Sequence, residues 1–405
     1  MSTRSPLESN SIGTAPDDLI AACADKGPSR STLPPPPKEP AFALAFSGGG
    51  FRATLSALGV LRFVTDAGLL PQVRYVSSVS GGSVAHGILA CAYPGLKSAG
   101  FTPQALDDLV IRPAVAVIST RSLTKTLFRN LWRTIGPRTR TNLLADEFNG
   151  WWFKDRLLEQ LDEGCRFIFN ASNVSTGVRF TFERDLLGDW VMGHAPTAGT
   201  GLRVADAVAS SAAVPGAFAP YVVKGVSFPC ANGRTAKLLD GGAYDNMGLE
   251  ALDKLPTVCL VALNAGGVFR TGAYRGLPIV RDLQRANGLL YRQTTALRMR
   301  TMVERFKATE DALAAGQTVP GWGRLGVLFG LATTIPDATA EWTEGRPEHP
   351  EWREELAEVH TSFAEFPPEL CERLLYRGWW LAGATLSRYH RSFLPSTLPT
   401  WRGLG

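Results

Sequence analysis

The chain has 405 residues, of which 45% are hydrophobic and 20% are charged. This composition excludes a mostly disordered protein and permits a large buried core, either in one α/β domain with an appendage or in two to three domains. The net charge of +5 is too small to indicate nucleic-acid binding, so no nucleic acid is expected as a partner.

The first 40 residues are polar and end in a cluster of prolines. They predict a disordered tail closed by a stiff polyproline spacer, which precedes the folded chain. They contain no apolar core of a secretory signal, and the longest uncharged apolar run, residues 325–335, is too short to span a membrane. The cysteines lack the spacing of metal ligands and are expected to be free thiols, so we predict a cytoplasmic protein.

The composition of the chain changes from polar to apolar at residue 41. Residues 41–46 predict a buried strand, followed by Ser47-Gly48-Gly49-Gly50 and a helical pattern. Residues 73–79 predict a second strand, which runs into Ser80-Gly81-Gly82 and another apolar helix. Two successive units of strand, glycine turn and helix indicate a parallel α/β sheet. Further strands are predicted at residues 166–170, 178–183, 236–239 and 257–263, and the last third is expected to be helical and irregular.

A basic stretch separates these strands. Over residues 121–135, arginine or lysine and leucine or isoleucine each recur every four residues, offset by two positions. On a helix this pattern places charged and apolar side chains on opposite faces. It fits either an interfacial helix that contacts anionic membranes or a surface helix packed on the core, and the second alternative is the more common one.

Ser80 is the candidate nucleophile. It lies between a β-branched strand and a helix, where a sharp turn would lift its hydroxyl clear of the sheet. Small neighbours are needed there because the backbone is strained and a substrate must approach closely. The helix that begins at Gly81 would also direct free N–H groups and its positive end toward the site.

The other glycine turn suits an anion. Gly48, Gly49 and Gly50 can direct their N–H groups outward, toward a phosphate or a developing oxyanion. The chain has neither the Gly-Lys-Ser/Thr of a nucleotide-binding loop nor the spacing of a dinucleotide fingerprint. Arg52 adds a positive charge at the same turn, unless it is a plain surface arginine.

Asp240 follows an apolar pair and precedes two glycines. A carboxylate at the end of a strand is well placed to act as a base, although an aspartate in a plain turn is the more common case. Because a free aspartate has a pKa of about 3.9, it is a poor base at neutral pH. We therefore expect partial burial to raise its pKa.

The motifs occur in the order S-G-G-G-F-R at 47–52, S-x-S-G-G at 78–82, A-S-S-A-A at 209–213 and D-G-G at 240–242. This combination resembles the patatin-like phospholipase family, and its first motif resembles the related cytosolic phospholipase A enzymes. The resemblance covers residues 41–270. The usual family elbow is G-x-S-x-G, and Ser78 stands here in its first position.

The resemblance implies a three-layer α/β/α domain over residues 41–270, with residues 271–405 forming a mainly helical region packed on it. It implies that Ser80 attacks an acyl ester and that Asp240 takes its proton. N–H groups of the 48–50 loop and of Gly81 would hold the oxyanion, and Arg52 would steady a substrate phosphate or support the loop. The substrates would be phospholipids or lysophospholipids. Neither a metal nor a cofactor is expected, and protein partners remain open.

Three alternatives stay open. One is a Ser-His-Asp α/β-hydrolase, for which His349, His360 and His390 qualify by their position after Asp240. Another is a lipid-binding protein of the same fold without catalysis. The third keeps the site but transfers the acyl group to an alcohol instead of water.

Overall fold

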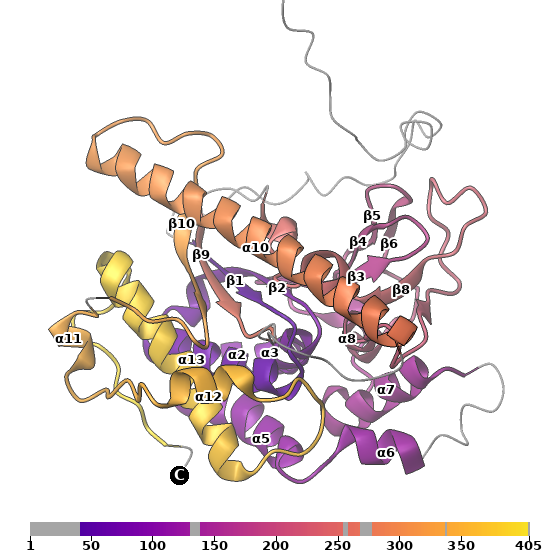
Figure 1. The fold of residues 1–405 in the computed structure, drawn as a ribbon, viewed down its shortest axis with the longest axis horizontal. Helices are drawn as coiled ribbons and strands as arrows, with labels where there is room; N and C mark the ends of the chain where they lie inside the picture. Colours follow the sequence, from indigo (N-terminus) through magenta and orange to yellow (C-terminus); the bar gives the residue numbers. More distant parts are fainter. Residues whose placement is uncertain (1–40, 130–137, 254–257, 268–277, 337, 404–405) are drawn as a thin grey trace, which may run out of the picture.

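The computed structural model describes residues 41–129, 138–253, 258–267, 278–336 and 338–403. These residues form a mixed β-sheet with helices on both faces (Figure 1). The strand order is β10-β9-β1-β2-β3-β4-β5-β6, with β8 also paired to β3 and β7 paired to β8. The strands from β10 to β3 are parallel, whereas the pairs beyond β3 are antiparallel. The bounds are β1 Ala41–Phe46, β2 Val73–Ser78, β3 Arg166–Asn173, β4 Val178–Phe182, β5 Leu186–Asp189, β6 Gly193–Pro196, β7 Tyr221–Val222, β8 Lys237–Asp240, β9 Val258–Asn264 and β10 Leu325–Gly330.

The helices vary from single turns to one of 37 residues. They are α2 Gly50–Asp66, α3 Gly81–Ser98, α4 Pro103–Leu106, α5 Arg112–Ile118, α6 Leu123–Arg129, α7 Arg140–Phe148, α8 Val204–Ser211, α9 Gly242–Asp245, α10 Pro278–Ala314, α11 Ala340–Thr343, α12 Trp352–Glu358 and α13 Pro368–Tyr389. Short 3₁₀ segments lie at Leu70–Gln72, Leu158–Gln160, Glu250–Leu252 and Arg391–Phe393, and π-helical turns lie at Asp107–Ile111 and Asn149–Phe153.

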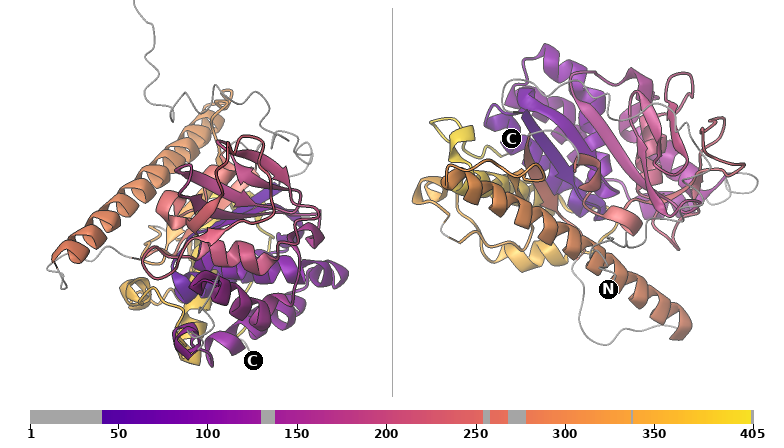
Figure 2. Two further views of the ribbon diagram at one scale, coloured as in Figure 1. Left: turned by 90° about the vertical axis from the view of Figure 1, so that its right-hand side faces the viewer. Right: turned by 90° about the horizontal axis from the view of Figure 1, so that it is seen from above.

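The central strand β1 shows how the two faces are covered. Its residues alternate between large and small side chains, and successive side chains of a strand point to opposite faces. Phe42, Leu44 and Phe46 pack into the main core with α2, α3, α8 and α13. Ala41, Ala43 and Ala45 face a second core that includes Met302 and Phe306 of α10. The helix α10 therefore lies on the side of the sheet opposite α2 and α3 (Figure 2), which confirms the three-layer arrangement.

The C-terminal region is tied closely to the rest of the fold. The helix α13 packs against α2, where a Cβ on Gly59 would lie 2.0 Å from a carbonyl of α13, and one on Gly378 would lie 2.1 Å from a carbonyl of α2. Only glycine permits so close a helix crossing. This region also adds β10 to the sheet beside β9, so the sheet extends beyond residue 270. That strand was not predicted.

The remaining sequence predictions have mixed outcomes. The basic stretch forms α6 only as far as Arg129, its Leu123 is 1% exposed, and residues 130–137 lie outside the described part, as does the proline-rich tail. Cys230 forms a disulfide bond, so the expectation of free thiols is wrong for this residue. The other described cysteines, Cys91, Cys165, Cys259 and Cys371, are free. In the described ranges, no helix is both long and apolar enough to cross a membrane.

Candidate active site

Ser80 lies at the sharp turn between β2 and α3. Its φ of 52° and ψ of −121° lie in a region that side chains other than glycine rarely adopt, which stores about 1–3 kcal/mol of strain. The next residue must be glycine, because a Cβ on Gly81 would lie 2.0 Å from the carbonyl oxygen of Gly50. The predicted strained turn is thus present, and it is pressed against the other glycine turn.

The glycine loop lies beside Ser80 because β1 and β2 are parallel neighbours, with Phe46 opposite Ser78. A Cβ on Gly48 would come within 3.1 Å of the Cβ of Ser80. The N–H of Gly48 donates to the carbonyl of Asn246 at 3.0 Å. The N–H groups of Gly49, Gly50 and Gly81 have no hydrogen-bond acceptor among the described residues.

Arg52 is 1% exposed, and its partners in the described part of the chain are oxygen atoms that carry no formal charge. Its guanidinium donates to the carbonyl of Ala265 at 3.1 and 2.9 Å, to that of Ala357 at 3.1 Å, to that of Val359, and to the hydroxyl of Thr361 at 3.1 Å. Burial lowers its pKa to about 10. The alternative of a surface arginine is therefore wrong, and Arg52 fastens the C-terminal region to the start of α2.

Asp240 ends β8, which pairs with β3 and so brings the carboxylate to the edge of the sheet where β1 and β2 also end. The side chain is buried, and this burial raises its pKa to about 6. Hydrogen bonds from the Ser80 hydroxyl and from the N–H of Gly242 favour the charged form and oppose part of that rise. The N–H of Gly242 lies 2.7 Å from the carboxylate. The expected burial of Asp240 is confirmed.

The helix α10 lies beside Asp240 and the turn that follows it. Tyr291 lies near two glycines of the site. A Cβ added to Gly242 would be 3.5 Å from the Tyr291 ring, and a Cβ added to Gly266 would be 2.8 Å from the Tyr291 hydroxyl. Burial raises the pKa of the Tyr291 phenol, and the nearby charge of Asp240 raises it further. Tyr291 also lines a cavity of about 410 Å³, together with residues that include Gly266 and Thr295.

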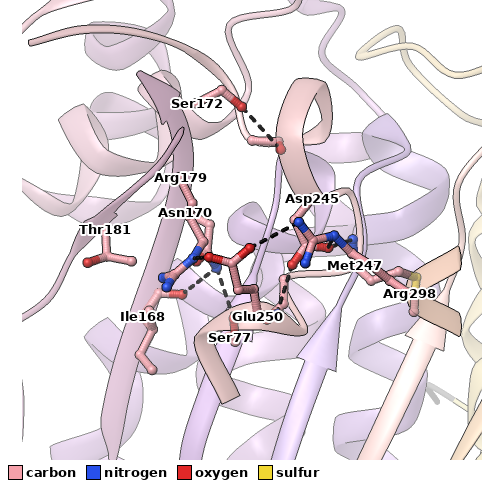
Figure 3. Close-up of polar contacts among 12 residues, drawn as sticks. Ser77, Ile168, Asn170, Ser172, Arg179, Thr181, Asp245, Met247, Glu250 and Arg298 are labelled. Atoms are coloured by element: carbon pink, nitrogen blue, oxygen red, sulfur yellow. Dashed lines mark hydrogen bonds and ion pairs between the residues drawn. The ribbon is translucent and has the colours of Figure 1, made fainter. Parts of the chain in front are cut away.

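A partly buried polar cluster joins α10 to the loop that follows Asp240 (Figure 3). Arg298, seven residues after Tyr291 and therefore on the same face of α10, lies 3.0 Å from Glu250 and 3.7 Å from Asp245. Arg179 of β4 approaches the other oxygen of Glu250 at 3.4 Å. The charges on these groups hold the loop against both the helix and the sheet. No local sequence pattern marks Tyr291 or Arg298, because their partners lie far away in the chain.

The late histidines have other partners. His349 stacks on Trp352 with ring centroids 4.0 Å apart, and the ring of His390 lies 3.1 Å from the carbonyl of Gly326. His360 is exposed. In the described part of the chain, none of them makes a hydrogen bond to Ser80 or Asp240.

The model of the patatin-like phospholipase family matches residues 44–253, which is more than half of the chain and includes every motif described above. The chain belongs to the patatin-like phospholipase family. This family consists of lipid acyl hydrolases, and the observed sheet with its flanking helices agrees with that membership.

Solved structures support the same fold. Human GIVD cytosolic phospholipase A2 superposes with a TM-score of 0.53 at 13% identity, over 89% of this chain and 60% of that one. Its complex with methyl γ-linolenyl fluorophosphonate gives a TM-score of 0.50 at 14% identity, over 87% and 59%. The chain thus spans about 60% of the length of these structures. No curated protein sequence matches the chain.

Proposed function

We propose that the protein is a serine acyl hydrolase that cleaves fatty-acyl esters of phospholipids or lysophospholipids with Ser80 and Asp240. One observation carries the proposal: a serine on a strained turn lies against a buried carboxylate whose pKa is about 6. This pKa leaves the carboxylate charged at neutral pH and makes it a stronger base than an ordinary aspartate.

The reaction would proceed in two steps. Ser80 attacks the ester carbonyl and its proton passes to Asp240, after which the alcohol leaves with that proton and an acyl-enzyme remains. Water then attacks the acyl group, Asp240 accepts a proton from it, and the fatty acid departs as the proton returns to Ser80. No histidine takes part in this scheme.

The oxyanion would be held by the N–H groups of Gly49, Gly50 and Gly81, which are free to donate. Gly48, the fourth residue expected from the sequence, already donates to Asn246, so it is left out of the proposal. Loss of one such donor typically removes about 3–4 kcal/mol of transition-state stabilisation. The hydrogen bonds of Arg52 favour support of the glycine loop over contact with a substrate phosphate.

The testing experiment measures fatty-acid release from mixed phospholipid vesicles with EDTA present. We expect loss of activity in Ser80→Ala and Asp240→Asn and full activity in His360→Ala. Loss in the histidine variant would indicate a triad instead. Lipid binding without turnover would indicate a binding protein, and acyl transfer to added glycerol would indicate a transferase.

A further inference from the structure

Ser211, the last residue of α8, forms hydrogen bonds with the backbone of both the Ser80 turn and the Asp240-Gly241 turn. Its hydroxyl accepts a hydrogen bond from the N–H of Ser80 at 2.9 Å, and its carbonyl accepts one from the N–H of Gly241 at 3.2 Å. Two residues later, the carbonyl of Ala213 accepts from the N–H of Asp240 at 2.9 Å. The A-S-S-A-A motif at 209–213 therefore joins the backbone of the nucleophile to that of the base.

The hydroxyl of Ser211 also ends a chain of buried polar groups. It donates to the carbonyl of Asn170 at 2.6 Å and lies 2.9 Å from the hydroxyl of Ser83. The hydroxyl of Ser83 lies 2.9 Å from that of Ser78, which in turn lies 2.6 Å from Nδ1 of His86. Each of these side chains is less than 2% exposed.

The number of available protons fixes the direction of every hydrogen bond in this chain. A carbonyl only accepts, so the single hydroxyl proton of Ser211 is used on Asn170. Ser83 must therefore donate to Ser211, and Ser78 must donate to Ser83. Ser78 then has no proton left for the imidazole, so Nδ1 of His86 must be the donor.

The surroundings of His86 agree with this assignment. A neutral imidazole with its proton on Nδ1 carries a lone pair on Nε2, and Nε2 has no hydrogen-bond partner among the described residues. The ring stacks on Phe169 with centroids 4.2 Å apart, and its burial lowers its pKa to about 3. His86 is thus a fixed neutral donor at physiological pH.

We propose that Ser211 is the residue that positions the nucleophile Ser80. His86, Ser78 and Ser83 form a directed hydrogen-bond chain that orients the hydroxyl of Ser211. Because the proton of the Ser211 hydroxyl is used on Asn170, its two lone pairs accept hydrogen bonds from the Ser83 hydroxyl and from the N–H of Ser80. That N–H is drawn toward the interior, which holds Ser80 in its strained conformation with its side chain on the opposite side, facing Asp240. Hydrogen bonds in such a chain polarise and strengthen one another.

The kinetic test compares Ser211→Ala with Ser210→Ala. Ser210 is an equally buried neighbour whose hydroxyl, among the described residues, bonds only to the carbonyl of Asp206 within α8, so it is a matched control. We expect Ser211→Ala to lower kcat on lysophospholipid by about 10- to 100-fold, the loss typical of a misplaced reacting group, with KM unchanged. Ser210→Ala should retain wild-type kcat. Equal effects of the two substitutions, or a change confined to KM, would overturn the proposal.

A second readout separates this inference from the proposed function, on which its kinetic part rests. A fluorophosphonate forms a bond from the Ser80 oxygen to phosphorus as fluoride leaves, and the hydroxyl proton passes to Asp240. Labelling of the wild type at Ser80 that becomes slow in Ser211→Ala supports the positioning role, whereas an equal rate overturns it. Absence of labelling in the wild type would instead refute the proposed function.

The direction of the chain is tested without any turnover. In ¹⁵N spectra of histidine-labelled protein, His86 should show a protonated Nδ1 and an unprotonated Nε2 from about pH 5 to about pH 8. A wild-type imidazole protonated on Nε2, or a ring that titrates in this range, would overturn the assignment.

Discussion

Replacement of Asp240 by asparagine should inactivate the protein and at the same time make its stability less dependent on pH. The burial of Asp240 raises its pKa from 3.8 to about 6. A carboxyl with a raised pKa binds more protons in the folded protein than in the unfolded chain between these two values, so folding stability falls as the pH rises through that window. The difference corresponds to about 3 kcal/mol at neutral pH.

Asparagine removes this dependence because it carries no charge, while its oxygen still accepts from the N–H of Gly242. We therefore expect Asp240→Asn to match the wild type in stability near pH 3, below the pKa of the unfolded chain, and to exceed it by about 3 kcal/mol near pH 8. Urea unfolding of both proteins at the two pH values measures the difference. Ser80→Ala is the control, because it is also inactive but keeps the carboxylate; loss of the Ser80 hydrogen bond should raise the pKa of Asp240 further, so this variant should depend on pH at least as strongly as the wild type.

A stability difference between Asp240→Asn and the wild type that is equal at both pH values would refute this reasoning. It would mean that Asp240 has an ordinary pKa in the folded protein. The activity of the wild type provides a parallel check, because kcat/KM should rise as the pH passes through about 6, where the base loses its proton.

Three further predictions concern the glycine turn, the polar cluster at α10 and the basic helix α6. Gly81→Ala places a Cβ 2.0 Å from a backbone carbonyl and should abolish fatty-acid release from vesicles. Gly150→Ala is the control, because its added Cβ would meet no atom within 4 Å, and it should keep wild-type activity in the same assay. Arg298→Met leaves the buried carboxylate of Asp245 without its cation, so hydrogen exchange over residues 240–252 should become faster while that of β1 stays unchanged. Arg129→Glu should weaken binding to anionic vesicles if α6 contacts membranes, and unchanged sedimentation with vesicles would end that hypothesis.

The sequence predicted the centre of the sheet well, because continuous apolar runs bounded by glycine turns are typical of buried parallel strands. β1 has the predicted bounds and β2 ends one residue early. β10 was missed, since its run Leu325–Gly330 was considered only as a membrane span that was too short. Its strand character depends on pairing with β9, about 60 residues earlier, which no local pattern records.

The site divides in the same way. Ser80, Asp240 and the glycines stand in local motifs whose spacing limits what the backbone can do, so they could be selected from the sequence. Ser211 and Arg298 act through partners that are distant in the chain. A buried serine in an alanine-rich helix has the same local appearance whether its hydroxyl packs or holds a nucleophile, and only the fold distinguishes the two.

Ser78 stands where the family pattern has glycine, and its hydroxyl depends on Ser83 and His86 for hydrogen bonds. Its buried hydroxyl would lack a partner without Ser83 and His86, and a stranded polar group costs about 1–3 kcal/mol. Ser78→Gly restores the family residue, yet it should destabilise the protein because it strands Nδ1–H of His86. His86→Phe alone removes the donor to Ser78. The double variant should be less destabilised than the sum of the two, and additivity in a double-mutant cycle would show that the serine and the histidine do not depend on each other.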